Sequence, residues 1–117
     1  MELVNCPCCG FPTLGEPAAY LICRLCNWED DGQGDLDANE VWGGPNGSYS
    51  LSEARENFKK FRTMYHPDDS KINRRESFAV LEVKEKLIEA YSKLNTVPQE
   101  LKERAVNEIF KLEKLLS

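Results

Sequence analysis

The chain has 117 residues, of which 41% are hydrophobic and 30% are charged, and its formal net charge is -5 at pH 7. This composition is typical of a folded, soluble domain of modest size. No apolar run approaches the roughly 18 to 20 residues of a membrane-spanning helix, and the N-terminus lacks the basic and apolar pattern of a secretory signal. We therefore expect a cytoplasmic protein without a membrane segment.

Charge is distributed unevenly along the chain. Residues 1–50 carry eight acidic side chains and one basic side chain, whereas residues 51–117 carry 14 basic and 12 acidic ones. The first part thus has a net charge of -7 and the second a net charge of +2. Because the acidic part opposes binding to phosphate backbones, we do not expect a nucleic-acid partner.

Two Cys-x-x-Cys pairs near the N-terminus are the clearest chemical motif, and we call each pair with its turn a knuckle. Two-residue spacers let both sulfurs of a knuckle reach one ion, and the 13 residues between the knuckles are enough to bring them together. In a reducing compartment, such thiols favour metal over disulfides. The spacing predicts a tetrahedral Zn²⁺ site, with redox dithiols or an iron–sulfur cluster as alternatives. The predicted ligands are Cys6, Cys9, Cys23 and Cys26.

The residues beside the knuckles suit this geometry. Gly10 follows the first knuckle and Asn27 follows the second, and both residue types tolerate the positive φ that lets N–H groups point toward a thiolate. Between the knuckles, residues 19–22 predict a short strand leading into Cys23, as in a zinc ribbon.

Cys8 and His66 are the candidates for thiol chemistry. Cys8 lies inside the first knuckle but outside the Cys-x-x-Cys spacing, and His66 is the single histidine. We interpret Cys8 as a small side chain without a chemical role. The alternative is a cysteine nucleophile assisted by His66, which requires the two side chains to be adjacent.

An acidic segment, residues 29–40, follows the second knuckle. We interpret it as a solvated loop, and the functional alternative is a recognition surface for a basic protein. Trp28 and Trp42 flank this segment, and we expect both in the core of the metal module, with partner anchors as the alternative. The acidic residues are Glu29, Asp30, Asp31, Asp35, Asp37 and Glu40.

The pattern becomes helical near residue 50. Ser50 and Glu53 form a capping box, and the helix that they start is expected to end before Pro67, in the turn of residues 65–69. Apolar residues recur three or four positions apart at Leu51, Ala54, Phe58, Phe61 and Tyr65. The outer face of this helix carries the basic residues that a nucleic-acid reader would use with Arg24, namely Arg55, Lys59, Lys60 and Arg62.

Two further amphipathic helices are expected. The first should cover residues 74–94, and the second should begin at a capping box of Thr96 and Gln99, with Pro98 in its first turn. The short link between them predicts an antiparallel hairpin. Its facing residues are expected to be Leu87, Tyr91 and Leu94 against Leu101, Ile109 and Leu112.

The order of these motifs over residues 5–62 resembles the bacterial cysteine-rich CPCC family of small proteins. CPCCG is followed by a second Cys-x-x-Cys with WEDDG, then by GGPNG and SLSEARENFKKF. The resemblance implies a zinc-binding module and no particular activity. It places the metal ligands at Cys6, Cys9, Cys23 and Cys26, and residues beyond 66 lie outside the shared pattern.

These patterns predict an α+β fold with two regions. A zinc ribbon of short strands with its acidic loop should occupy residues 1–48, and a helical region over 49–117 should pack with it as one domain. The expected function is a zinc-binding, non-enzymatic protein-interaction module or adaptor, whose protein partner is basic. A nucleic-acid-binding zinc ribbon and a thiol-dependent enzyme using Cys8 are the alternatives, and the oligomeric state is left open.

Overall fold

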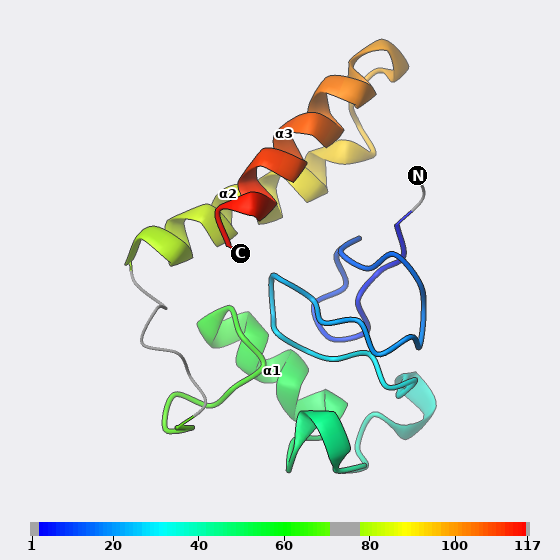
Figure 1. The fold of residues 1–117 in the computed structure, drawn as a ribbon, viewed down its shortest axis with the longest axis vertical. Helices are drawn as coiled ribbons and strands as arrows, with labels where there is room; N and C mark the ends of the chain where they lie inside the picture. The colour runs from blue at the N-terminus through cyan, green and yellow to red at the C-terminus, as the bar shows by residue number, and fades with distance from the viewer. Residues whose placement is uncertain (1–2, 71–77, 117) are drawn as a thin grey trace. The chain divides into compact units, whose positions relative to one another are not determined.

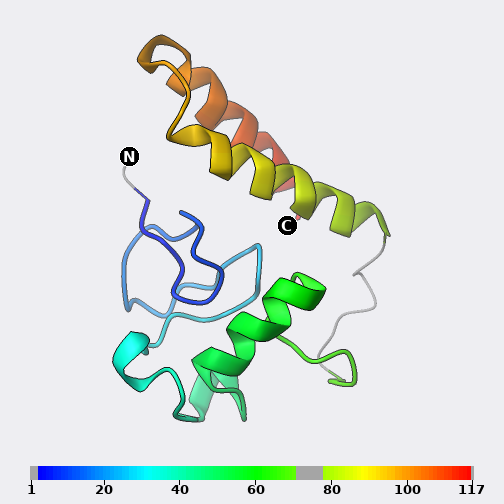
Figure 2. The same cartoon turned by 180° about the vertical axis from the view of Figure 1, so that it is seen from behind.

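The structure is a computed structural model that describes residues 3–70 and 78–116 (Figures 1 and 2). The chain divides into two compact units, Met1–Ile72 and Asn73–Ser117, which we call the cysteine unit and the helical unit. None of the helices in the described ranges is long and apolar enough to cross a membrane. The described α-helices are α1 (Leu51–Phe61), α2 (Phe78–Leu94) and α3 (Lys102–Lys114), and the short 3-10 turns are η1 (Asp35–Asp37), η2 (Gly44–Asn46) and η3 (Gln99–Leu101).

The predicted α+β fold is wrong, because the described residues form helices and no β-strand or sheet, so the fold is all-α. Extended pairing within these ranges consists of two isolated antiparallel bridges, Val4 with Leu14 and Ile22 with Glu29. The strand expected at residues 19–22 does not form, because the φ of Tyr20 is 58°, in the left-handed region. Loops held by single bridges therefore replace the expected ribbon.

The helix α1 begins at the predicted capping box. Ser50 Oγ accepts a hydrogen bond from the N–H of Glu53 at 3.1 Å, and Glu53 Oε1 accepts one from the N–H of Ser50 at 3.3 Å. This reciprocal pair satisfies two backbone donors that the first turn would otherwise leave open. The predicted stripe is buried at Leu51, Ala54 and Phe58.

The end of α1 differs from the prediction. The helix ends at Phe61 rather than just before Pro67, because Arg62 adopts the left-handed conformation with a φ of 61° and caps the helix. The chain then turns back toward the second knuckle, where the N–H of Met64 donates to the carbonyl of Cys26 at 2.7 Å. Because α1 ends early, the residues that follow it can contact the second knuckle.

In the helical unit, α2 and α3 lie side by side and run antiparallel in both views (Figures 1 and 2), which confirms the predicted hairpin. Leu87, Tyr91 and Ile109 are buried as expected, and Tyr91 Oη donates to Glu113 Oε1 at 2.6 Å. Leu101, expected in this contact, is 43% exposed. The expected start near residue 74 lies outside the described residues.

The capping box predicted for the third helix is wrong. Thr96 Oγ1 donates to the carbonyl of Lys93 at 2.9 Å, so its hydroxyl caps the end of α2 instead. The chain then passes through η3, whose N-cap is Pro98, and α3 begins at Lys102. A hydroxyl between two helices can serve either one, and local pattern does not decide which.

In the cysteine unit, Trp28 is fully buried, as predicted. Trp42 is 46% exposed, so its predicted core position is wrong.

The side chain of Asn46, in η2, bonds to both backbone polar groups of Glu29, as the backbone of a neighbouring strand would in a sheet. Its Oδ1 accepts from the backbone N–H of Glu29 at 3.0 Å, and its Nδ2 donates to the carbonyl of Glu29 at 2.8 Å. The GGPNG turn thus holds the segment after the second knuckle in place.

Candidate metal centre

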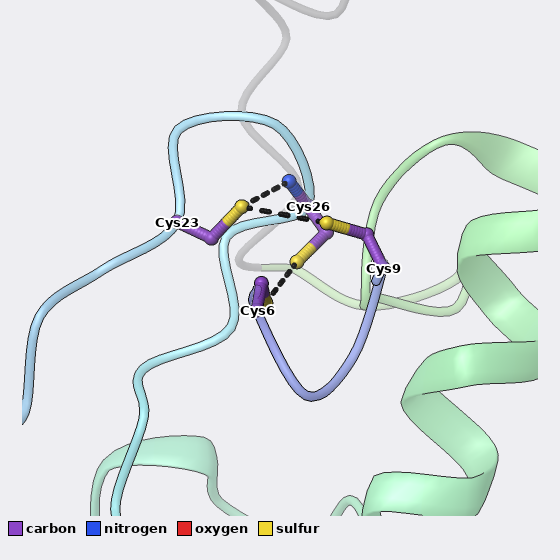
Figure 3. Close-up of side chains that lie close together, drawn as sticks. All are labelled: Cys6, Cys9, Cys23 and Cys26. Carbon is purple, nitrogen blue, oxygen red and sulfur yellow. Dashed lines mark hydrogen bonds between the residues drawn. The ribbon is translucent and has the colours of Figure 1, made fainter. Parts of the chain in front are cut away.

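The side chains of the four paired cysteines converge on one point, as Figure 3 shows. Cys6 Sγ lies 3.6 Å from Cys26 Sγ, and Cys9 Sγ lies 3.7 Å from Cys23 Sγ. The ligand atoms of all four residues lie within 4.8 Å of one another. None of the four is in a disulfide, three of them are buried, and Cys9 is half-buried.

These distances fit one tetrahedral ion. A zinc–thiolate bond of about 2.3 Å places any two ligand sulfurs of a tetrahedron about 3.8 Å apart. Both short sulfur pairs join one knuckle to the other, so an ion at their centre would crosslink the two loops. The four cysteines can therefore hold a metal ion.

The two knuckles have the same backbone closure. The carbonyl of Cys6 accepts from the N–H of Gly10 at 2.8 Å, and the carbonyl of Cys23 accepts from the N–H of Asn27 at 2.8 Å. The φ values of Gly10 and Asn27 are 80° and 75°, as predicted. Their N–H groups donate to these carbonyls rather than to sulfur, and a described N–H···S contact runs from Cys26 to Cys23 Sγ at 3.5 Å.

A hydroxyl that sequence reasoning missed also contacts the cluster. Thr13 Oγ1 donates to Cys23 Sγ at 3.1 Å. Thr13 lies between the knuckles at no recognisable ligand spacing, so nothing in the linear pattern identified it. Hydroxyl donors of this kind stabilise thiolate charge and orient the ligand.

The thiols perturb one another's protonation. Hydrogen bonding from Cys26, with a smaller contribution from Thr13, lowers the pKa of Cys23. Burial raises the pKa of Cys26, and the hydrogen bond with Cys23 raises the pKa of Cys9. A cation among the four sulfurs would favour the thiolate form of every one. Metal binding at this site must therefore release protons, and acid must oppose it.

Arg55 connects α1 to the first knuckle and to the acidic segment. Its Nε donates to the carbonyl of Pro7 at 2.8 Å, and its Nη2 lies 2.7 Å from Asp35 Oδ1. In the nucleic-acid alternative, Arg55 would lie on the outer basic face of the helix and contact phosphate. In the structure it positions the backbone inside the CPCC motif.

Two other basic residues proposed for nucleic-acid binding also have partners within the chain. Lys59 Nζ lies 3.2 Å from Glu56 Oε1, and the guanidinium of Arg62 lies 5.4 Å from the centre of the Phe58 ring. Both side chains carry positive charges that a phosphate-binding face would use, and here they contact groups of the same helix region instead. No described contact favours the nucleic-acid alternative.

No described contact joins Cys8 to His66. Cys8 is 7% exposed and is outside the group of four converging sulfurs. His66 Nδ1 lies 3.5 Å from Asp68 Oδ2, its ring contacts Phe61, and its backbone N–H donates to Tyr49 Oη at 2.9 Å. None of these described contacts is with Cys8, so the geometry offers no support for a cysteine–histidine nucleophile.

The acidic segment is only partly the solvated loop that was predicted. Asp30 is 5% exposed, and its carboxylate accepts from the N–H of Ala18 at 2.8 Å and from that of Gly32 at 3.2 Å. Asp31 Oδ1 accepts from the N–H of Gln33 at 3.2 Å. These two carboxylates hold the backbone, whereas others in the segment are exposed, including Asp35 and Glu40.

One comparison with known proteins identifies a family for this chain. The family model described as cysteine-rich CPCC matches residues 4–77, which include the four converging cysteines and α1 but not α2 or α3. No curated protein and no solved structure matches the chain. Since the matched residues make up more than half of the chain, this protein belongs to the cysteine-rich CPCC family.

Proposed function

We propose that this protein is a non-enzymatic protein-interaction module whose cysteine unit is kept folded by one zinc ion. The observation that supports this most directly is the convergence of four thiols within 4.8 Å, with two sulfur pairs close to tetrahedral spacing at 3.6 Å and 3.7 Å. Four thiolates complete the shell of a zinc ion and leave no position for a substrate, so the ion would be structural. Its ligands would be Cys6, Cys9, Cys23 and Cys26.

The construction of the cysteine unit supports a structural ion. In the described residues, the loops before α1 are held by two isolated bridges and by scattered hydrogen bonds rather than by a sheet. Loops without regular strand pairing have few backbone hydrogen bonds to hold them, so a crosslink between them adds to their stability. One ion would supply that crosslink between the knuckles.

The proposed partner is a basic protein. The net charge of -7 in residues 1–50 supports this choice, because a negative surface attracts cationic partners and speeds their encounter. The same charge disfavours nucleic acid.

The experiment is native mass spectrometry of the full-length chain, with Cys23→Ser and Cys8→Ser as a matched pair. We expect one zinc per chain in the wild type and in Cys8→Ser, and loss of zinc in Cys23→Ser. A wild-type protein without metal, or a Cys23→Ser variant with full occupancy, would contradict the metal assignment.

The partner assignment needs its own measurement. Binding of a purified cationic partner should be slower at higher salt and should be lost when a chelator removes the metal. Binding that survives metal removal would contradict a zinc-organised interaction module.

A further inference from the structure

A short loop in the cysteine unit exposes apolar side chains beside acidic ones. We call residues 35–42 the docking loop. Leu36, in η1, is fully exposed at 104%, and Val41 and Trp42 are 54% and 46% exposed. Single exposed apolar residues are ordinary, but three within eight residues, including a tryptophan, are typical of interface anchors.

The loop backbone is held in a defined shape by a buried glutamine. Gln33 is 2% exposed, and its Nε2 donates to the carbonyls of both Asp37 and Glu40, at 2.8 Å and 2.6 Å. Because one nitrogen contacts both carbonyls, Leu36 and Val41, which flank them, belong to one tightly closed turn. Such a turn loses little conformational freedom when a partner binds.

Contacts from two residues of α1, Ser52 and Arg55, fix this turn to the rest of the cysteine unit. The N–H of Ser52, in the first turn of α1, donates to the carbonyl of Ala38 at 2.9 Å, and Ser52 Oγ donates to Asn39 Oδ1 at 2.6 Å. Arg55 joins Asp35 to the carbonyl of Pro7 in the first knuckle. The apolar side chains are thus presented from a fixed support rather than from a loose segment.

The negative charge of the docking loop favours a positively charged partner. The loop contains three acidic residues and no basic one, and one of the acids, Asp35, pairs with Arg55 of α1. Two copies of the loop facing each other would therefore repel, which argues against self-association through this surface.

We propose that the docking loop binds a basic protein segment in which lysine or arginine side chains alternate with large apolar ones. The inference rests on the proposed function and names its contact surface. Leu36 and Trp42 would occupy apolar positions of the partner, while Asp37 and Glu40 would face its cations. The acids would speed association, and the apolar contacts would slow dissociation.

The test uses the full-length, zinc-loaded chain as bait for a random 12-residue peptide library displayed on phage. Enriched peptides should combine a net positive charge with large apolar residues. Synthetic versions should bind Leu36→Ser and Trp42→Ser roughly tenfold or more weakly than the wild type. The matched control is Leu115→Ser, which removes a 65% exposed leucine from the helical unit and should leave binding unchanged.

Each other outcome overturns the proposal. If enriched peptides bind Leu36→Ser and the wild type equally, the peptides bind another surface. This result contradicts the proposed role of the docking loop but not the proposed interaction function. If no peptide is enriched, or if the enriched peptides are acidic, the result contradicts both the role of the docking loop and the proposal of a basic protein partner. A wild-type dimer in sedimentation that Leu36→Ser dissociates would assign the loop to a second copy instead. Zinc content and circular dichroism of each variant establish that it is folded.

Discussion

Replacing Arg55 with methionine should weaken metal binding although Arg55 contacts no cysteine sulfur in the described structure. The change removes a 2.8 Å hydrogen bond from a cationic donor to the carbonyl of Pro7, inside the CPCC motif. Such bonds contribute about 1.5 to 3 kcal/mol, and the 32% exposure of the Arg55 side chain favours the lower part of that range. Loss of the exposed pair with Asp35 adds at most about 1 kcal/mol.

The expected total is about 1.5 to 2.5 kcal/mol, which corresponds to a metal affinity roughly 10- to 70-fold weaker when folding and binding are linked. The metal affinity of each variant can be measured by competition with a chromophoric chelator, on the full-length chain at fixed pH. Asp35→Asn is the control, because it removes only the ion pair with an 87% exposed carboxylate and should change affinity less than about threefold. Equal effects of the two variants would refute a role for the bond to Pro7.

Three further outcomes are expected. Ile109→Ala should destabilise the helical unit by about 2 to 5 kcal/mol in thermal unfolding, because Ile109 is 3% exposed, whereas Leu115→Ala should cost under about 0.5 kcal/mol. Asp30→Ala should lower stability in urea by about 2 to 4 kcal/mol, since it leaves two backbone N–H groups without their acceptor, while Glu40→Ala should have little effect. Burial and the hydrogen bond to Asp69 raise the pKa of Tyr49 above 10.0. The stability that the protonated Tyr49 hydroxyl contributes to the fold is therefore complete below about pH 10 and is lost as pH rises further. The difference in unfolding free energy between wild type and Tyr49→Phe should shrink only in that alkaline range.

Features encoded by a few neighbouring residues could be predicted from the sequence. Cys-x-x-Cys spacing limits where two sulfurs can lie, and the structure brings both pairs together. The capping box of Ser50 and Glu53 is a contact between residues three apart, so it forms as the pattern indicates. Gly10 adopts its positive φ for the same local reason.

Features that depend on distant segments could not be predicted in this way. The strand expected at residues 19–22 fails where Tyr20 turns left-handed, its N–H donating to the carbonyl of Asp30. Asp30 itself looks like one more surface acid in the sequence, yet its carboxylate accepts from the N–H of Ala18, 12 residues away. Arg55 lies 48 residues from Pro7, so its use inside the knuckle has no local signature.

The candidate metal centre and the docking loop share one support, through which a structural ion would affect the proposed recognition without contacting a partner. Arg55 holds the carbonyl of Pro7 with one nitrogen and the carboxylate of Asp35 with another. Fixing the first knuckle with an ion would fix one end of this bridge, and the bridge in turn restrains the loop that displays Leu36. An interaction surface gains affinity when its anchors are already ordered before binding. The ion would therefore act on affinity through the order of the loop, which is the physical sense in which a closed four-thiolate site can serve a binding protein.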